Sequence, residues 1–200
     1  MIIGMEYSDF LELARSSIQK SIYVGNGSFA SYRENVETVK TEHPDIIEQY
    51  ELTESELFVM FMMLIKNYDE IQQCASSGKG TLFVQECVRQ YDSFLSKVPV
   101  SESSISFGID KSERIENYVN ISAFNYKKYM IASTHQSIFD NFQNGLKLVI
   151  NRRLIGTTKA HEIFKIFNAN DKFQVNFERN TRFRVDGVDK KDKVVFLTEL

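Results

Sequence analysis

The sequence predicts an α+β fold in which a helical lobe precedes a mostly antiparallel β core. Before position 98, apolar residues recur at helical spacing. After Pro99, short segments rich in Ile, Val and Phe alternate with polar turns, which is typical of strands. Hydrophobic residues make up 42% of the 200 positions, which is enough to bury a core. We therefore expect a helical lobe over residues 1–98 and a β core over residues 99–200, joined into one integrated domain.

The helices of the first half have recognisable starts. Ser31–Glu34 and Thr53–Glu56 both fit the Ser/Thr-x-x-Glu capping box that begins many helices. The run from Leu57 to Ile65 is apolar on all sides, so we expect its helix to be the buried centre of the lobe. Further helices are expected over Phe10–Ile22, from Pro44 onward and over Leu82–Leu95.

The second half reads as strands with one helix between them, over Thr134–Phe142. Thr181–Val185 and Lys193–Leu197 bracket a turn over residues 186–192 and predict a hairpin. The expected strands are Ile105–Ile109, Tyr118–Phe124, Leu146–Ile150, Ile163–Phe167, Phe173–Phe177, Phe183–Val188 and Val194–Leu197.

Charge is unevenly distributed along the chain. Residues 143–193 carry twelve Lys and Arg against six Asp and Glu, although the whole chain has a net charge of −3. A basic stretch beside an acidic remainder can steer a charged partner, and the aromatic residues within it leave nucleic-acid binding possible. A solvated sheet with cations on its outer face explains the same pattern equally well.

Several other function classes have no support in the sequence. The segment around Gly78, Lys79 and Gly80 lacks the spacing and the preceding strand of a phosphate-binding loop. The three histidines are scattered, so no metal site is expected. Cys74 and Cys87 lie in helical segments without a pairing motif, which fits a reducing cytoplasm. We expect no signal peptide, and no apolar run approaches the roughly 20 residues of a membrane span.

From Ser104 onward, the order of features resembles the core of the phage and bacterial mono-ADP-ribosyltransferases. That family has an aromatic-Arg-Gly strand, then a Ser-Thr-Ser strand that leads into a short helix. A Gly-plus-apolar strand follows, and a Glu-x-Glu segment then precedes Thr-x-Phe-x-Val. The corresponding segments here are Ile105–Ile109, Ile131–Ser133 with the helix to Phe142, Asn144–Ile150 and Phe173–Val185.

The resemblance places other residues at the family's catalytic positions. The catalytic Glu stands seven residues before the Thr, a position that is Gln174 here, and the first Glu of the pair falls on Lys172. Phe107 stands at the Arg position and Ile131 at the first Ser. The family's Gly and its final Ser are retained as Gly108 and Ser133.

These substitutions remove the family's chemistry. Phe107 cannot hold phosphates as a forked guanidinium does, and Ile131 has no hydroxyl for the ribose. Gln174 can form hydrogen bonds but supplies no negative charge to an oxocarbenium-like centre. An active site would need a displaced acid, Asp171 or Glu178. Glu178 shares the strand face of Gln174 but would lie roughly 13 Å away at ~3.3 Å per residue.

The resemblance therefore implies a non-catalytic, ADP-ribosyltransferase-like binding protein of the cytoplasm that needs no cofactor. We expect a protein partner, and by analogy a phage-encoded inhibitor of a host toxin or defence transferase. The first alternative is an active NAD-dependent mono-ADP-ribosyltransferase that modifies host proteins, with Gly108 and Ser133 contacting NAD. The second is a nucleic-acid-binding accessory protein that uses residues 143–193.

Overall fold

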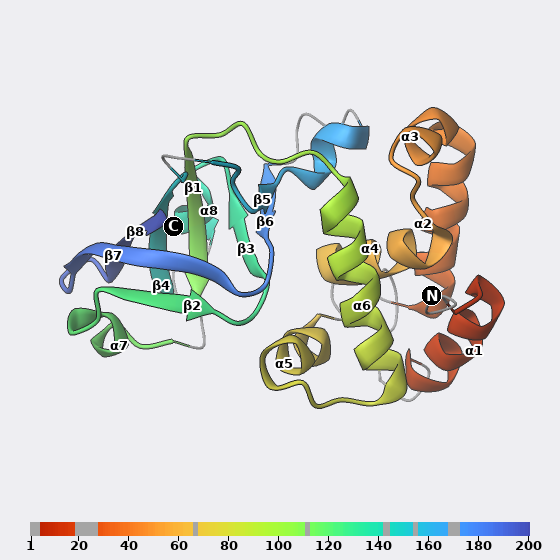
Figure 1. The fold of residues 1–200 in the computed structure, drawn as a ribbon, viewed down its shortest axis with the longest axis horizontal. Coiled ribbons are helices and arrows are strands. Elements are labelled where there is room, and N and C mark those ends of the chain that lie inside the picture. Colours follow the sequence, from red (N-terminus) through yellow and green to blue (C-terminus); the bar gives the residue numbers. More distant parts are fainter. Residues whose placement is uncertain are drawn as a thin grey trace. The chain divides into compact units, whose positions relative to one another are not determined.

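The computed structural model describes residues 5–18, 28–65, 68–110, 113–141, 145–153, 156–167 and 173–200. The chain divides into two compact units, Met1–Val98 and Pro99–Leu200 (Figure 1). The first unit is helical and the second carries the sheet, so the α+β fold class is confirmed. No described helix is long and apolar enough to cross a membrane.

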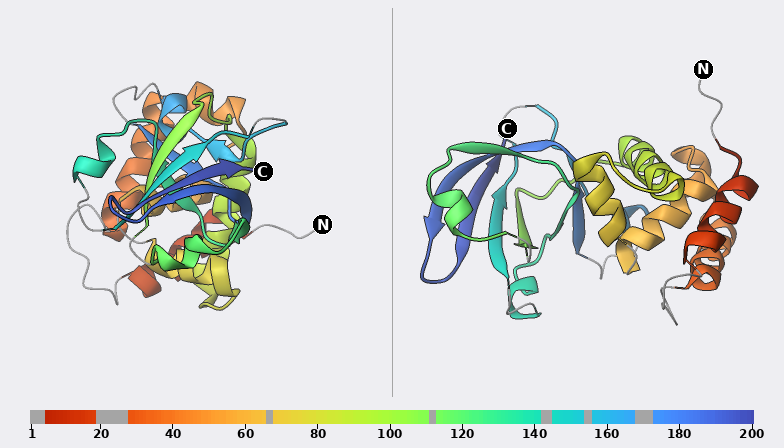
Figure 2. Two further views of the ribbon diagram at one scale, coloured as in Figure 1. Left: turned by 90° about the vertical axis from the view of Figure 1, so that its left-hand side faces the viewer. Right: turned by 90° about the horizontal axis from the view of Figure 1, so that it is seen from below.

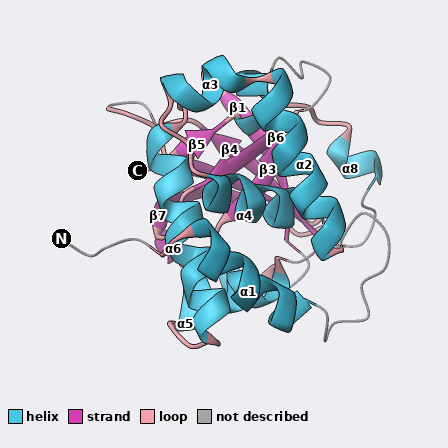
Figure 3. Ribbon diagram, turned by 90° about the vertical axis from the view of Figure 1, so that its right-hand side faces the viewer, coloured by secondary structure: helices cyan, strands magenta, loops and turns pink. Residues whose placement is uncertain are grey.

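The helical unit packs around one apolar helix. The α4 helix lies between α2 and α6 (Figure 3) and buries eight of its twelve residues, as the apolar run from Leu57 predicted. Phe58 is central to this packing, because the rings of Phe10, Phe29 and Tyr32 all lie within 6 Å of its ring. The helices are α1 (Tyr7–Ile18), α2 (Phe29–Glu42), α3 (Pro44–Gln49), α4 (Glu54–Ile65), α5 (Asp69–Ser77) and α6 (Leu82–Lys97).

The capping boxes had different outcomes. At the start of α4 the predicted box is confirmed, because Glu56 N–H donates to Thr53 Oγ1 (3.2 Å) and Thr53 N–H donates to Glu56 Oε2 (2.7 Å). At α2 the predicted box is wrong, because Ser31 lies inside the helix and its N–H donates to the capping Ser28 Oγ. The earlier cap lets Phe29 and Ala30 form the first turn of α2.

Both cysteines of the helical unit are buried and unpaired. Burial raises the pKa of the Cys87 thiol well above its ordinary value, and the neighbouring Glu86 carboxylate acts in the same direction. A thiol reacts as its thiolate, so a higher pKa and exclusion of solvent both slow its modification.

We therefore expect neither Cys74 nor Cys87 to react with an aromatic disulfide reagent in the native protein at pH 8. The release of the coloured thiol over an hour measures this directly, and the same chain in 8 M urea is the control. Prompt labelling of the native chain would contradict the buried positions.

The second unit is a curled eight-stranded sheet of order β2-β7-β8-β4-β1-β3-β6-β5. Only the β4–β8 pair is parallel among the described strands. The strands β2 and β7 run across the direction of β1 and β3 (Figures 1 and 2). The elements are β1 (Ile105–Asp110), α7 (Glu116–Val119), β2 (Ala123–Tyr126), β3 (Met130–Ser133), α8 (Ile138–Asn141), β4 (Leu146–Asn151), β5 (Ala160–His161), a 3₁₀ helix (Ile163–Phe167), β6 (Gln174–Phe177), β7 (Thr181–Asp189) and β8 (Val194–Glu199).

One face of this sheet forms the apolar core of the unit, which we call the inner face. The rings of Phe177 and Phe183 meet there with their centres 5.6 Å apart. The other face, here called the outer face, carries the alternate residues of each strand. The buried core consists of Tyr118, Met130, Ala132, Leu146, Leu148, Ile150, Ala160, Val175, Phe177, Phe183, Val195 and Leu197.

Two predicted strands are wrong. Residues 163–167 form a 3₁₀ helix, because the buried Ile163 and Ile166 are three residues apart and so share a face of that helix. The predicted strand Tyr118–Phe124 is instead the helix α7 followed by a strand that begins at Ala123. The short helix brings the Tyr118 ring edge-on to the ring of Phe124, with 5.3 Å between their centres.

The hairpin of β7 and β8 is confirmed, but its turn is shorter than predicted. A register shift between Val185 and Gly187 lets β7 continue to Asp189. The Asp189 carboxylate then accepts hydrogen bonds from the N–H groups of Lys191 and Asp192, which fixes the turn. Of the helix predicted over Thr134–Phe142, the described residues form a single turn, α8.

Candidate functional site

Three adjacent strands bring together the positions that the resemblance singles out. Phe107 on β1 is the register partner of Ser133 on β3, and Ser133 is in turn the partner of Gln174 on β6. Register partners in neighbouring strands point to the same face, so all three side chains lie in one row on the outer face. At ~4.8 Å per strand, the row spans about 10 Å.

The other two candidate positions lie near this row but differ in direction. Ile131 is two residues before Ser133, so it shares the outer face and is the register partner of Asn176. Gly108 faces inward, because a Cβ at that position would lie 3.5 Å from Leu148. The sheet therefore groups Phe107, Ile131, Ser133 and Gln174, whereas Gly108 belongs to the core.

The ring of Phe107 is covered by an aromatic side chain from α8. The Phe139 ring stands at 90° to it, with 5.7 Å between the ring centres. The Lys147 ammonium lies 5.6 Å from the centre of the Phe139 ring, as in a cation–π contact. An apolar pair thus occupies the position at which the resemblance predicts an arginine.

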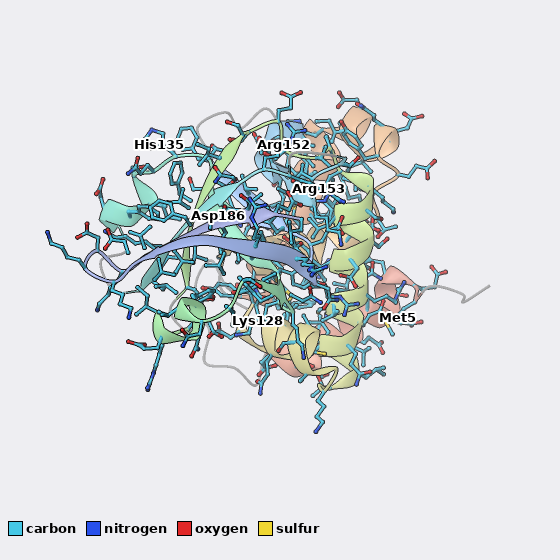
Figure 4. All side chains as sticks on the ribbon, turned by 60° about the vertical axis from the view of Figure 1, so that its left-hand side comes forward. Met5, Lys128, His135, Arg152, Arg153 and Asp186 are labelled. Carbon is cyan, nitrogen blue, oxygen red and sulfur yellow. The ribbon has the colours of Figure 1, made fainter. Side chains whose placement is uncertain are left out.

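Ser133 takes part in the turn that leads into α8. Its Oγ accepts a hydrogen bond from the N–H of His135 (3.0 Å), and the His135 ring lies against the ring of Phe173, with 5.2 Å between centres. Thr134 N–H also donates to the Phe173 carbonyl. Figure 4 labels His135, which is exposed. The retained serine therefore has a structural role in this turn.

Gln174 heads a row of polar side chains along β6. Its Nε2 donates to Asn176 Oδ1 (3.0 Å), and Asn176 is fully buried and opposite His161 on β5. The Nε2 of His161 lies 3.3 Å from Glu178 Oε1. The amide of Gln174 is thus already engaged, and Glu178 lies beside His161 rather than beside Phe107.

No charged side chain stands in the grouped positions among the described residues. The residues of β1, β3 and β6 on the outer face are apolar or neutral. The inward carboxylate of Asp110 accepts a hydrogen bond from Tyr126 Oη (2.9 Å). Lys172 and the candidate acid Asp171 lie outside the described residues. Such a neutral row can bind a ligand by contact and by hydrogen bonds.

The described part of the chain contains no group of three His, Cys, Asp or Glu that could hold a metal ion. A shallow hollow of about 550 Å³ lies in the helical unit and contains none of the grouped residues, so it gives no support to the site. The hollow is lined by Arg15, Phe29, Ala30, Arg33, Glu34 and Glu37.

Sequence reasoning missed two features of this site. The packing of Phe139 on Phe107 was not foreseen, although Phe139 lay in a predicted helix just after the Ser133 motif. The burial of Asn176 was also missed, although the alternation of Gln174 and Asn176 around Val175 already placed both polar side chains on one face.

Solved structures that resemble this chain are bacterial proteins, and they include ADP-ribosyltransferases and ADP-ribosylating toxins. The type III effector XopAI of Xanthomonas axonopodis pv. citri matches with a TM-score of 0.63 at 15% identity, over 86% of this chain and 72% of that chain. The C3 exoenzyme of Clostridium limosum matches with a TM-score of 0.59 at 14% identity, over 83% of this chain and 95% of that chain. Exoenzyme S of Pseudomonas aeruginosa, solved with carba-NAD and human 14-3-3 protein beta, matches with a TM-score of 0.58 at 13% identity. The match covers 84% of this chain and 88% of that chain.

These matches establish the class of fold. The chain has an α+β fold of the ADP-ribosyltransferase type, and identities of 13–15% establish the fold alone. No protein-family model and no curated protein sequence matches the chain.

Proposed function

We propose that this chain is a non-catalytic, ADP-ribosyltransferase-like protein that acts by binding. The observation that carries the proposal is the single row of Phe107, Ser133 and Gln174, in which the Phe107 ring is capped by Phe139. The row brings together the positions that the resemblance assigns to the family's catalytic groups, and its side chains lack the charge that those groups supply.

The residues present do not fit NAD. Neither Phe107 nor Phe139 donates a hydrogen bond to a phosphate, and Ile131 offers no hydroxyl to a ribose. Ser133 and Gln174 can form hydrogen bonds, but neither side chain supplies a charge to the cofactor. Loss of one electrostatic group of this kind typically costs about 10²–10³ in rate, so several losses together leave little activity.

The partner we propose is a protein, either an ADP-ribosylating toxin or the surface that such a toxin recognises. A chain with the transferase fold but no transferase chemistry is suited to compete for contacts that an active enzyme makes. The neighbouring exoenzyme S is bound to a 14-3-3 protein in its structure, which shows that a protein of this fold can dock onto another protein. By analogy we extend the proposal to a phage-encoded inhibitor of a host defence or toxin transferase, acting in the host-cell cytoplasm.

The test measures transfer and binding separately. We expect no transfer of label from NAD into a host-cell lysate, and no heat of NAD binding in calorimetry at millimolar concentration. An active ADP-ribosyltransferase in the same lysate is the positive control.

An active transferase is the second candidate function. One observation favours it: Glu178 directly follows β6, the strand that begins with Gln174, and its carboxylate lies 3.3 Å from His161 Nε2. Transfer that is lost in Glu178→Gln or Gln174→Ala, and kept in the exposed turn variant Lys191→Gln, would establish this candidate and overturn our proposal.

A further inference from the structure

The outer face of β1, β4 and β8 carries a strip of partly exposed apolar side chains. Phe107 is the register partner of Val149, and Val149 is the register partner of Phe196. Ile109 and Val194 lie two residues along the same strands and point to the same face. Phe196 and Ile105 are each 40% exposed. We call this the outer strip; its residues are Ile105, Phe107, Ile109, Val149, Val194 and Phe196.

The strip is kept open on its β7 side. Gly187 is the register partner of Phe196, and a Cβ built at Gly187 would lie 3.8 Å from the Phe196 ring. Because residue 187 has no side chain, nothing on β7 covers this part of the ring. Contiguous apolar surface that faces solvent is a common mark of a protein interaction site.

One charged side chain stands on the outer face of these three strands. Lys147 is the register partner of Ile109 and of Val194, so its stem is surrounded by the outer strip. It forms no ion pair within the described part of the chain, and its printed contact is with the face of the Phe139 ring. A half-buried cation without a counter-charge gains most from a partner that brings a carboxylate.

The carboxylates at the edge of the strip are already engaged. Asp186, labelled in Figure 4, accepts hydrogen bonds from Thr198 and from Arg184, whose Nε lies 2.6 Å away. Burial favours the neutral form of Asp186, but these two hydrogen bonds outweigh it and lower the pKa of Asp186. The carboxylate of Asp189 accepts from the turn backbone. Among the described residues, Lys147 is therefore the charged side chain on the outer face of β1, β4 and β8, and it has no counter-charge among them.

We propose that the outer strip is the surface through which the chain binds its protein partner. The partner seats one segment there, with apolar side chains on the strip and a carboxylate on Lys147. This inference rests on the proposed function. The strip measures about 10 Å by 13 Å at ~4.8 Å per strand and ~3.3 Å per residue, which suits one helix or strand rather than a whole domain. A single cation among six apolar side chains does not suit a phosphate backbone, which needs several cations.

The experiment selects binding peptides from a random library of about a dozen residues, displayed on yeast, against the full chain. We expect the selected peptides to combine Leu, Ile or Phe with Asp or Glu. Binding of a selected peptide should weaken about fivefold in Lys147→Gln, the scale of one partly exposed ion pair. It should be retained in Lys147→Arg. Phe196→Ser should weaken it as well, and the turn variant Lys191→Gln is the matched control.

Three outcomes overturn the inference. These are failure to select any peptide, selection of basic peptides, and binding that is indifferent to both Lys147→Gln and Phe196→Ser. Tighter and steeply salt-dependent binding of a 20-base-pair DNA would assign the surface to nucleic acid instead. Self-association that Phe196→Ser abolishes would assign it to a second copy of this chain. None of these binding experiments uses NAD. The peptide selection can therefore fail while the transfer assay still supports a non-catalytic protein, and the transfer assay can fail while peptide binding to the outer strip is still observed.

Discussion

Replacing Glu56 with alanine is expected to lower the free energy of unfolding of the helical unit by about 3 kcal/mol, near the lower end of values for a broken buried ion pair. The Glu56 side chain is 2% exposed and its carboxylate lies 2.8 Å from the ammonium of Lys97. It also accepts hydrogen bonds from Ser93 Oγ and from the N–H of Thr53. Removal of this carboxylate leaves the N–H of Thr53 and the hydroxyl of Ser93 without this acceptor and the Lys97 ammonium without its counter-charge. One half of the capping box is lost, whereas the N–H of residue 56 can still donate to Thr53 Oγ1.

The measurement is urea unfolding followed by circular dichroism at 222 nm, which reports mainly on helices. Glu54→Ala is the matched control in the same helix, because the ion pair of Glu54 with Lys40 is more exposed. It should change the stability by less than about 1 kcal/mol. Equal losses in the two variants would contradict the structural role of Glu56.

The second large effect is expected at Glu199 on β8. This side chain is 1% exposed, and its carboxylate accepts hydrogen bonds from Thr158 Oγ1 (2.6 Å), Lys159 N–H (2.6 Å) and Arg153 N–H (3.3 Å). It therefore holds both ends of the segment between β4 and β5. Figure 4 labels Arg153 in this segment. Glu199→Ala should destabilise the β unit by more than about 3 kcal/mol, since each hydrogen bond to a charged group is worth about 1.5–3 kcal/mol.

The local signature of this change distinguishes it from a general loss of stability. We expect the Lys159 amide to exchange its hydrogen about 100-fold faster in Glu199→Ala, because the local opening of this segment becomes easier. Amides in the β1–β4 pair should be affected much less. The conservative variant Glu199→Asp and the exposed substitution Lys190→Gln serve as comparisons. Unchanged protection at Lys159 would contradict the role of Glu199 as an anchor.

Local signals in the sequence predicted much of the fold. The capping box of Thr53 and Glu56 and the apolar run after it located α4, since both depend on near neighbours along the chain. Strands with clear alternation, such as Leu146–Ile150, were also found. The failure at residues 163–167 has the opposite cause, because an Ile-rich run fits a strand and a short helix equally well until its tertiary contacts decide.

The candidate site was predictable as a set of positions but not as a surface. The resemblance named Phe107, Ser133 and Gln174, which are far apart in the sequence, and the strand register places them in one row. The register depends on long-range pairing, which a single sequence does not encode locally. The same limit explains why the aromatic cap of Phe139 and the outer strip were invisible, since both arise only when distant strands and α8 come together.

The parallel pairing of β4 with β8 has a consequence for synthesis. Lys147 pairs with Val194, which emerges from the ribosome 47 residues later. At translation rates of roughly 5–20 residues per second, one edge of β4 therefore stays unpaired for several seconds after β4 is synthesised. During that interval the nascent chain exposes an unpaired strand edge beside Val149, a state in which neighbouring chains on a polysome can pair wrongly. We expect the nascent chain to depend on chaperones mainly between the synthesis of β4 and that of β8. Faster translation of the residues between these strands should reduce that dependence.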